Sequence, residues 1–260
     1  MVNLISLFHK RIGYTGKGKI GFNDLDVLLE KTAMAIPFEN LRIMEGAAKE
    51  LSEENLIEKI LVQHEGGLCY ELNPLLFLIL KDNGFDVEMV RGVVYDHSRK
   101  QWSETGMTHV AIILNRDGER YLVDTGFGGN LPLRPVPLNG EIVSSFNGEF
   151  RVARTETDYG DYIFHMKLSK DPDWKIGYAF NTREQFDDVK NLNSVQKVIV
   201  ENPASAFNKK RLITKLTNSG SMTLTEDTFT TWTNGRLEKK VIEEKQFKEI
   251  AKDKFGLGSV

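Results

Sequence analysis

The chain changes the spacing of its hydrophobic residues once, near residue 85, and this change limits the folds it can adopt. Before that point, apolar residues recur every three or four positions, as they do on one face of an α-helix. After it, β-branched and aromatic residues become frequent, as in strands. Helices followed by strands indicate an α+β fold, because a parallel doubly wound sheet needs the two to alternate.

Three helices are predicted in the first third of the chain. The first starts with Asn23 as its N-cap, and its apolar side is formed by Leu25, Leu28, Leu29 and Thr32. The second starts with Ser52 as its N-cap. The third starts at Cys69 and stops at Gly84. We expect its first turn to be distorted, because Pro74 lacks a backbone donor.

Strands are predicted from the middle of the chain onward. They cover residues 87–95, 108–116 and 118–127, and further strands are expected between residues 150 and 168. The pair Asp117-Gly118 predicts a two-residue hairpin turn between the second and third of these strands. The last third is mixed, with short strands, a second turn at Asn234-Gly235 and a final helix.

The composition argues against several classes of protein. One cysteine in 260 residues excludes an intramolecular disulfide and a multi-cysteine metal site, and it favours the reducing cytoplasm. We expect no metal, since no His-x₃-His motif is present either. A net charge of −3 argues against nucleic acid as a partner. The longest apolar stretch, Leu75 to Leu80, is far shorter than the ~20 residues that span a membrane.

Cys69 follows Gly66-Gly67-Leu68 and stands at the predicted start of a helix. Unpaired N–H groups and the helix dipole stabilise a thiolate at such a position, and glycines leave room for a substrate. The alternative is an inert cysteine buried in the core, as many free cysteines are. A nucleophilic thiol needs a base within hydrogen-bond distance, and that base needs an orienting acid.

His109 is the candidate base among the five histidines, because it starts a strand of the predicted hairpin. With a two-residue turn, His109 faces Gly126, and Asp124 is its diagonal neighbour on the same face, ~7–8 Å away between Cα atoms. A three-residue loop would move Asp124 to the other face. Asp124 could also merely cap the turn at Gly126. The sequence thus offers a Cys69–His109–Asp124 triad with these alternatives open.

Several segments together resemble the arylamine N-acetyltransferase family. They are RIG at 11–13, IPFENL at 36–41, GGLCYELN at 66–73, TGMTH at 105–109, VDTGFG at 123–128 and, more weakly, PASAF at 203–207. The resemblance implies an N-terminal helical bundle over residues 1–84 that carries the nucleophile. It implies a central antiparallel β-barrel over 85–190 that carries the histidine and aspartate, and a C-terminal α/β lid over 191–260.

The resemblance also implies a ping-pong acetyl transfer. Cys69 would take the acetyl group of acetyl-CoA as a thioester, which an arylamine, arylhydrazine or arylhydroxylamine would then attack. His109 would move the protons, and Asp124 would hold its imidazole in the right tautomer. The expected partners are CoA and a small aromatic amine or hydrazine, and the expected role is xenobiotic metabolism in the cytoplasm.

Further site residues follow from the resemblance by position. The acceptor pocket would be lined by Phe38, Tyr70, Val94, Phe127 and Phe207, although each aromatic residue could equally be core packing. Acetyl-CoA would contact Thr105, Gly106, Gly126, Phe127, Gly128 and Ser205. The backbone N–H groups of the glycine turn would then face its pyrophosphate.

The chain departs from the family pattern in three places, and one of them is Lys31, where the family often has a histidine. Glu65 stands where the family usually has an arginine, so that Glu65 and Glu39 would be two acids close together. We expect Arg11 to be the compensating cation. In the last third, Ala204 and Ala206 stand where some members have hydroxyl groups that contact the coenzyme, which leaves Ser205.

Three other functions remain open at this stage. The same triad could serve an amidase or thioesterase that uses water as the acceptor, or an intramolecular amide-forming synthase. The chain could also be a non-catalytic CoA-binding protein in which Cys69 is inert. The glycine turn beside Asp124 and the aromatic pocket positions favour transfer over hydrolysis.

Overall fold

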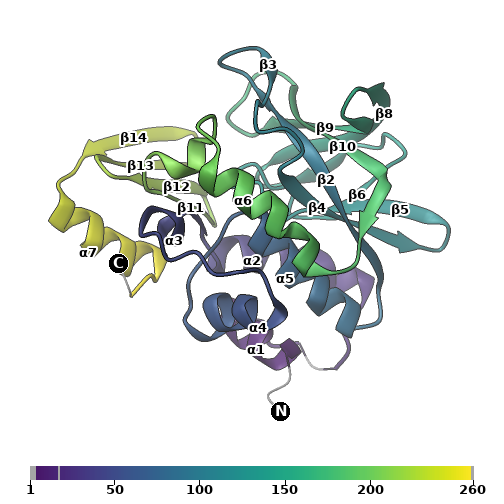
Figure 1. Ribbon diagram of the computed structural model, residues 1–260, viewed down its shortest axis with the longest axis horizontal. Helices are drawn as coiled ribbons and strands as arrows, with labels where there is room; N and C mark the ends of the chain where they lie inside the picture. The colour runs from purple at the N-terminus through teal and green to yellow at the C-terminus, as the bar shows by residue number, and fades with distance from the viewer. Residues whose placement is uncertain (1–3, 17, 259–260) are drawn as a thin grey trace.

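The computed structural model describes residues 4–16 and 18–258. It contains a group of helices, a large antiparallel sheet that nearly closes into a barrel, and a smaller antiparallel sheet with one helix (Figure 1). This architecture confirms the predicted α+β fold. Within the described residues, the helices are too short or too polar to cross a membrane.

Helices dominate the N-terminal part. They are α1 (Leu4–Ile12), α2 (Leu25–Ala35), α3 (Leu41–Met44), α4 (Glu53–Leu56) and α5 (Cys69–Asp82), with a π-helix, Ile57–Val62, after α4. The Ser52 cap is confirmed, since its side chain accepts the N–H of Asn55 at 3.2 Å. The prediction that Asn23 caps α2 is wrong, because a 3₁₀ turn, Phe22–Asp24, precedes that helix. The carboxylate that accepts a backbone N–H there belongs to Asp24.

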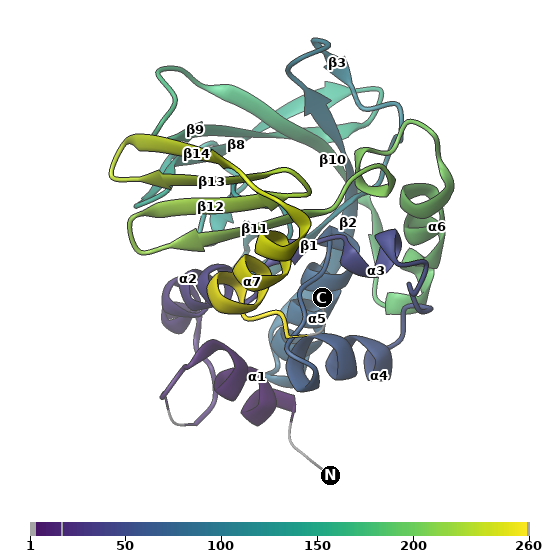
Figure 2. The same ribbon diagram turned by 90° about the vertical axis from the view of Figure 1, so that its left-hand side faces the viewer.

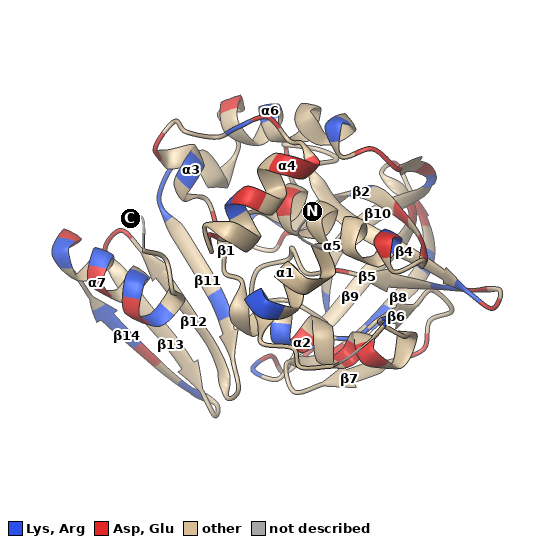
Figure 3. Ribbon diagram, turned by 90° about the horizontal axis from the view of Figure 1, so that it is seen from below, with Lys and Arg blue, Asp and Glu red and all other residues tan. Residues whose placement is uncertain are grey.

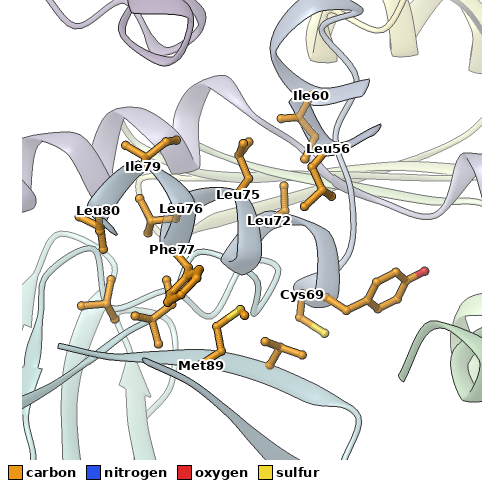
Figure 4. Close-up of a cluster of buried hydrophobic side chains, with 14 of the residues drawn as sticks. Leu56, Ile60, Cys69, Leu72, Leu75, Leu76, Phe77, Ile79, Leu80 and Met89 are labelled. Atoms are coloured by element: carbon orange, nitrogen blue, oxygen red, sulfur yellow. The ribbon is translucent and has the colours of Figure 1, made fainter. Parts of the chain in front are cut away.

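The helix α5 is the central element of the helical core. It continues from Cys69 to Asp82 through Pro74, so the helix tolerates the missing donor opposite the carbonyl of Tyr70 without a break. Its apolar side packs on α4, the π-helix and the strand β2 (Figure 4); the side chains labelled there include Leu72, Leu75, Leu76, Leu56, Ile60 and Met89. Gly84, with φ of +82°, follows the end of the helix as predicted.

The barrel-like sheet has the strand order β6-β5-β4-β2-β10-β9-β8-β7, and β3 also pairs with β2. Its strands are β2 (Asp86–Asp96), β3 (Gln101–Trp102), β4 (His109–Arg116), β5 (Glu119–Val123), β6 (Val136–Pro137), β7 (Val143–Ser145), β8 (Gly148–Thr157), β9 (Gly160–Leu168) and β10 (Lys175–Phe186). All of the pairings are antiparallel, and β6 comes close to β8. The sequence did not predict β10.

The turn between β4 and β5 confirms the predicted hairpin. Asp117 and Gly118 have φ of +51° and +83°, which is the conformation of a type I′ turn. Arg116 therefore pairs with Glu119. The same register extends down both strands, so it fixes which residues of the hairpin share a face.

The smaller sheet joins the first and last thirds of the chain. Its order is β1 (Phe38–Glu39), β11 (Leu212–Thr217), β12 (Gly220–Thr225), β13 (Thr228–Thr233) and β14 (Arg236–Val241). The helix α7 (Glu244–Phe255) packs on this sheet (Figure 2), and basic and acidic residues are interspersed along it (Figure 3). The helix α6 (Asn193–Glu201), which the sequence did not predict, packs instead into the helical core through Val195 and Ile199.

Truncation of a core residue of α5 tests this account of packing. Leu80 is fully buried, so Leu80→Ala is expected to lower the free energy of unfolding by about 2–5 kcal/mol. The matched control is Leu237→Ala, because Leu237 is 60% exposed on β14 and should change stability by less than about 0.5 kcal/mol. Urea denaturation measures both; equal losses would contradict the assignment of α5 to the core.

Candidate active site

A cavity of about 460 Å³ lies where the helices, the barrel and the segment before β11 meet. Cys69 and His109 both line it. Cys69 reaches it from the first residue of α5 and His109 from the first residue of β4. The predicted nucleophile and base therefore meet at the wall of one cavity, with 7% and 4% of their surfaces exposed.

Cys69 is held tightly by its neighbours. Its sulfur lies 3.5 Å from the carbonyl oxygen of Thr108, and the thiol interacts with the imidazole of His109. Gly126 packs directly on it, since a Cβ atom added at Gly126 would lie 2.6 Å from the Cα of Cys69. The position of this thiol relative to the hairpin thus depends on a glycine at 126.

His109 and Asp124 form the predicted pair. The Nε2 of His109 lies 2.8 Å from Oδ2 of Asp124, which leaves Nδ1 as the ring nitrogen for the thiol of Cys69. Burial alone would lower the pKa of His109, but the carboxylate of Asp124 and hydrogen bonds to Asp124 and Cys69 raise it to about 10. The imidazole is therefore set to be protonated at neutral pH.

Asp124 accepts four hydrogen bonds, although it is only 1% exposed. Its Oδ2 accepts from His109 and from the hydroxyl of Tyr178, each at 2.8 Å. Its Oδ1 accepts from Asn73 at 2.8 Å and from the N–H of Gly126 at 2.7 Å. Burial raises the pKa of Asp124, but these donors and the charge of His109 lower it overall. Asp124 thus both caps the turn and orients the histidine, through different oxygens.

Two residues of this network were not predicted as site residues. Tyr178 belongs to the unpredicted strand β10, and its ring centroid lies 4.3 Å from that of His109. No local signal in the sequence pointed to it. Asn73 lies one helical turn after Cys69, and its Oδ1 also accepts the N–H of Thr125 at 2.8 Å. The i,i+4 spacing from the cysteine was a usable signal for Asn73.

The predicted acceptor residues fall into two groups. Phe38, Val94, Phe127 and Phe207 line the cavity, and the rings of Phe38 and Phe207 meet edge to face at 5.6 Å. Tyr70 does not; it is 1% exposed and lies in the helical core. We correct its assignment accordingly: successive residues of a helix point about 100° apart, so Tyr70 turns away from the cavity that Cys69 faces.

The predicted coenzyme residues also divide. Thr105, Gly126, Phe127 and Ser205 line the cavity, whereas Gly106 and Gly128, both described in the structure, do not. Among the N–H groups of the glycine turn, that of Gly126 donates to Asp124 and so does not face a pyrophosphate, whereas a role for the others stays a prediction. Ala204 and Ala206 line the cavity beside Ser205, which is itself 1% exposed.

The two acids near the glycine pair, Glu65 and Glu39, have other cationic partners than the predicted Arg11. Glu65 pairs with Arg42, whose Nε donates to its Oε2 at 2.8 Å. Lys59 lies 3.6 Å from Glu39. Arg11 instead donates to backbone carbonyl oxygens, including that of Ala35 at 2.8 Å. The expectation that Arg11 compensates these acids is therefore wrong.

Comparison with known proteins gives a consistent class. The family model described as N-acetyltransferase matches residues 22–259. An uncharacterized acetyltransferase of Bacillus subtilis, YvcN, is 39% identical over 87% of each chain. The crystal structure of arylamine N-acetyltransferase C from Bacillus anthracis is 44% identical over 99% of each chain, with a TM-score of 0.94.

A second solved structure extends the comparison. The arylamine N-acetyltransferase NAT3 of Bacillus cereus is 42% identical over 99% of each chain, with a TM-score of 0.94, and is described as having a unique Cys-His-Glu catalytic triad. The present chain has Asp124 beside its histidine. It is an acyltransferase, and it belongs to the arylamine N-acetyltransferase family.

Removing the charge of Asp124 tests the His109–Asp124 pair. In Asp124→Asn, no carboxylate opposes the lowering of the His109 pKa by burial. His109 should therefore lose its proton at neutral pH. We expect alkylation of Cys69 by iodoacetamide at pH 7 to slow by about tenfold or more. The control is Asp161→Asn, which alters a buried aspartate that is hydrogen-bonded to Thr182. Wild-type alkylation rates in Asp124→Asn would show that Asp124 only caps the turn.

Adding a methyl group at Gly126 tests the contact with Cys69. Gly126→Ala should force the hairpin away from α5, which lowers the free energy of unfolding by about 1–3 kcal/mol and slows alkylation of the thiol. Gly129→Ala is the control in the same turn, because a Cβ atom there meets nothing within 4 Å. Thermal unfolding and alkylation rates that do not differ between the two variants would refute the close contact.

Proposed function

We propose that this chain transfers an acetyl group from acetyl-CoA to an aromatic amine, by a ping-pong mechanism through a thioester on Cys69. The observation that carries the proposal is that Cys69 and His109 line one 460 Å³ cavity and that His109 is hydrogen-bonded to the buried Asp124. We assign Cys69 as the nucleophile, His109 as the general acid and base, and Asp124 as the residue that orients the imidazole.

In the first half-reaction, His109 holds the proton of the thiol, so that the sulfur of Cys69 is a thiolate. The thiolate attacks the carbonyl carbon of the acetyl group, and a new C–S bond forms. The bond from that carbon to the sulfur of CoA then breaks. The leaving sulfur takes the proton from His109, so CoA departs as a neutral thiol and the imidazole is left neutral.

In the second half-reaction, the nitrogen of the amine attacks the carbonyl carbon of the acetyl-cysteine. His109 accepts a proton from that nitrogen as the amide forms and the C–S bond to Cys69 breaks. The sulfur leaves as a thiolate beside a protonated imidazole, which restores the starting state. Asp124 stabilises the imidazolium in this state without taking the proton itself.

The walls of the cavity favour a flat acceptor. Phe38, Val94, Phe127 and Phe207 offer apolar and aromatic surface close to the thiol, which suits an aromatic ring and limits the access of water to the thioester. We assign Thr105 and Ser205, on the same cavity, to contacts with the coenzyme.

The wider predictions belong to the same proposal. We assign the enzyme to the cytoplasm, since its single cysteine must stay reduced to act, and we extend the family resemblance to a role in xenobiotic metabolism. We also propose that residues 1–84, 85–190 and 191–260 act as three units, a bundle, a barrel and a lid.

The test is intact-protein mass spectrometry after brief mixing with acetyl-CoA and no acceptor. We expect the wild-type protein to gain one acetyl group, and Cys69→Ser to gain none because it lacks the thiolate. Aniline should discharge the adduct faster than 2,2,2-trifluoroethylamine, a weakly basic amine that is also largely unprotonated at neutral pH but has no aromatic ring. The same samples are assayed for released CoA.

Each other result contradicts a stated part of the mechanism. Steady release of CoA without an adduct would indicate hydrolysis by water, as in a thioesterase. The absence of both an adduct and CoA release would refute acetyl-CoA as the donor. An adduct that persists in Cys69→Ser would refute the nucleophile, and equal discharge by both amines would refute the aromatic acceptor.

A further inference from the structure

A largely buried lysine lies behind the start of α5, outside the catalytic series. Lys59 belongs to the π-helix Ile57–Val62, and its side chain is only 15% exposed. A π-helical turn accommodates one extra residue, and such turns are frequent at functional sites. The ammonium group of Lys59 donates to Oε1 of Glu71 at 2.6 Å and lies 3.6 Å from Oε1 of Glu39.

Glu71 connects Lys59 to the start of the helix that carries the nucleophile. Its Oε2 accepts the N–H of Leu68 at 2.9 Å, while its Oε1 accepts from Lys59. A Cβ atom added at Gly67 would lie 2.9 Å from Oε2 of Glu71, so this glycine leaves the space that the carboxylate fills. The residue after Leu68 is Cys69, and its backbone direction is therefore set partly by Glu71.

Glu39 connects the same lysine to the wall of the cavity. Glu39 is 1% exposed, and its Oε2 accepts the N–H of Leu41 at 2.6 Å. Its own N–H donates to the carbonyl oxygen of Gly67 at 3.1 Å. The residue before it is Phe38, which lines the cavity. One ammonium group thus joins the segment of an aromatic wall residue to the glycine turn before the nucleophile.

Lys59 is the cation in direct contact with these two buried acids. The third acid nearby, Glu65, is paired with Arg42. Burial opposes the charge of Lys59, yet the charges of Glu71 and Glu39 raise its pKa overall, so the ammonium stays protonated. Burial raises the pKa of Glu39, against the charge of Lys59. His109, Tyr178 and Tyr70 are titratable groups that interact with Cys69 itself.

We propose that Lys59 is a positioning residue for the nucleophile: it holds Glu71 and Glu39 in place and offsets the negative charge of Glu71, which follows Cys69 by two residues in the chain. A thiolate two residues from an uncompensated carboxylate would be destabilised by repulsion. The proposal rests on the proposed function of Cys69 as a reactive thiolate. It assigns Lys59 no contact with the substrates.

The test measures the rate of Cys69 alkylation by iodoacetamide against pH, together with thermal unfolding. In Lys59→Met the profile should move to higher pH, so that the rate at pH 7 falls by about tenfold. Glu71→Gln should move it to lower pH, because the amide keeps an acceptor for Leu68 but carries no charge. Lys59→Arg should restore a profile close to that of the wild type.

The control is Lys175→Met, which removes a more exposed lysine that donates to Asp171 at 2.7 Å on the barrel. Its profile should match that of the wild type. A Lys59→Met protein that unfolds at lower temperature but keeps the wild-type profile would overturn the proposal and leave Lys59 a purely structural role.

Two further results separate the proposal from the proposed function. If Lys59→Met does not fold, an unchanged profile in Glu71→Gln overturns the positioning role. A wild-type thiol that reacts no faster at pH 7 than free cysteine would overturn the proposed function, and this inference with it. A fast wild-type thiol with unchanged variants overturns this inference alone.

Discussion

The buried carboxylate of Asp124 is the interaction on which the rest of the site depends. Removing a charged carboxylate from water costs several kcal/mol unless its oxygens are well paired. Here the four donors come from α5, β4, β10 and the turn after β5. Each of these elements must be in place before the charge is satisfied, so the same contacts that complete the fold also orient the histidine. The helices and the barrel are joined at the point where chemistry is proposed to occur.

The parts of this site that follow from short-range rules could be predicted. The Asp117-Gly118 turn fixes the register of β4 and β5, and the register places His109 beside Asp124. Periodicity and the glycine pair predicted a helix that starts at Cys69. Tyr178 could not be found in this way, because β10 has a bulge in its pairing with both neighbours and a weak alternation. Tyr178 reaches Asp124 because β10 pairs with β2, and this pairing between distant segments cannot be read from local sequence.

The charges behind the nucleophile show a second limit of prediction. The family resemblance implies that Glu65 and Glu39 lie close together, but it does not say which cation pairs with them. Arg11 was expected to pair with these acids, but its guanidinium group donates hydrogen bonds to backbone carbonyl groups instead. The cations come from α3 and from the π-helix, whose directions depend on the packing of several helices. Charge pairs made across the fold follow its three-dimensional arrangement, whereas caps and turns follow neighbouring residues.

The short strand β1 gives the molecule an order of assembly. Phe38 pairs with Thr214, and the amide of Asn40 bonds to Phe207, Lys210 and Leu212, up to 172 residues away. During synthesis on the ribosome, the thiol, the histidine and the aspartate all emerge well before these partners. The aromatic wall that Phe38 and Phe207 form together is therefore completed last. A nascent chain would therefore contain the reactive groups before it contained the complete cavity wall that shields a thioester from water.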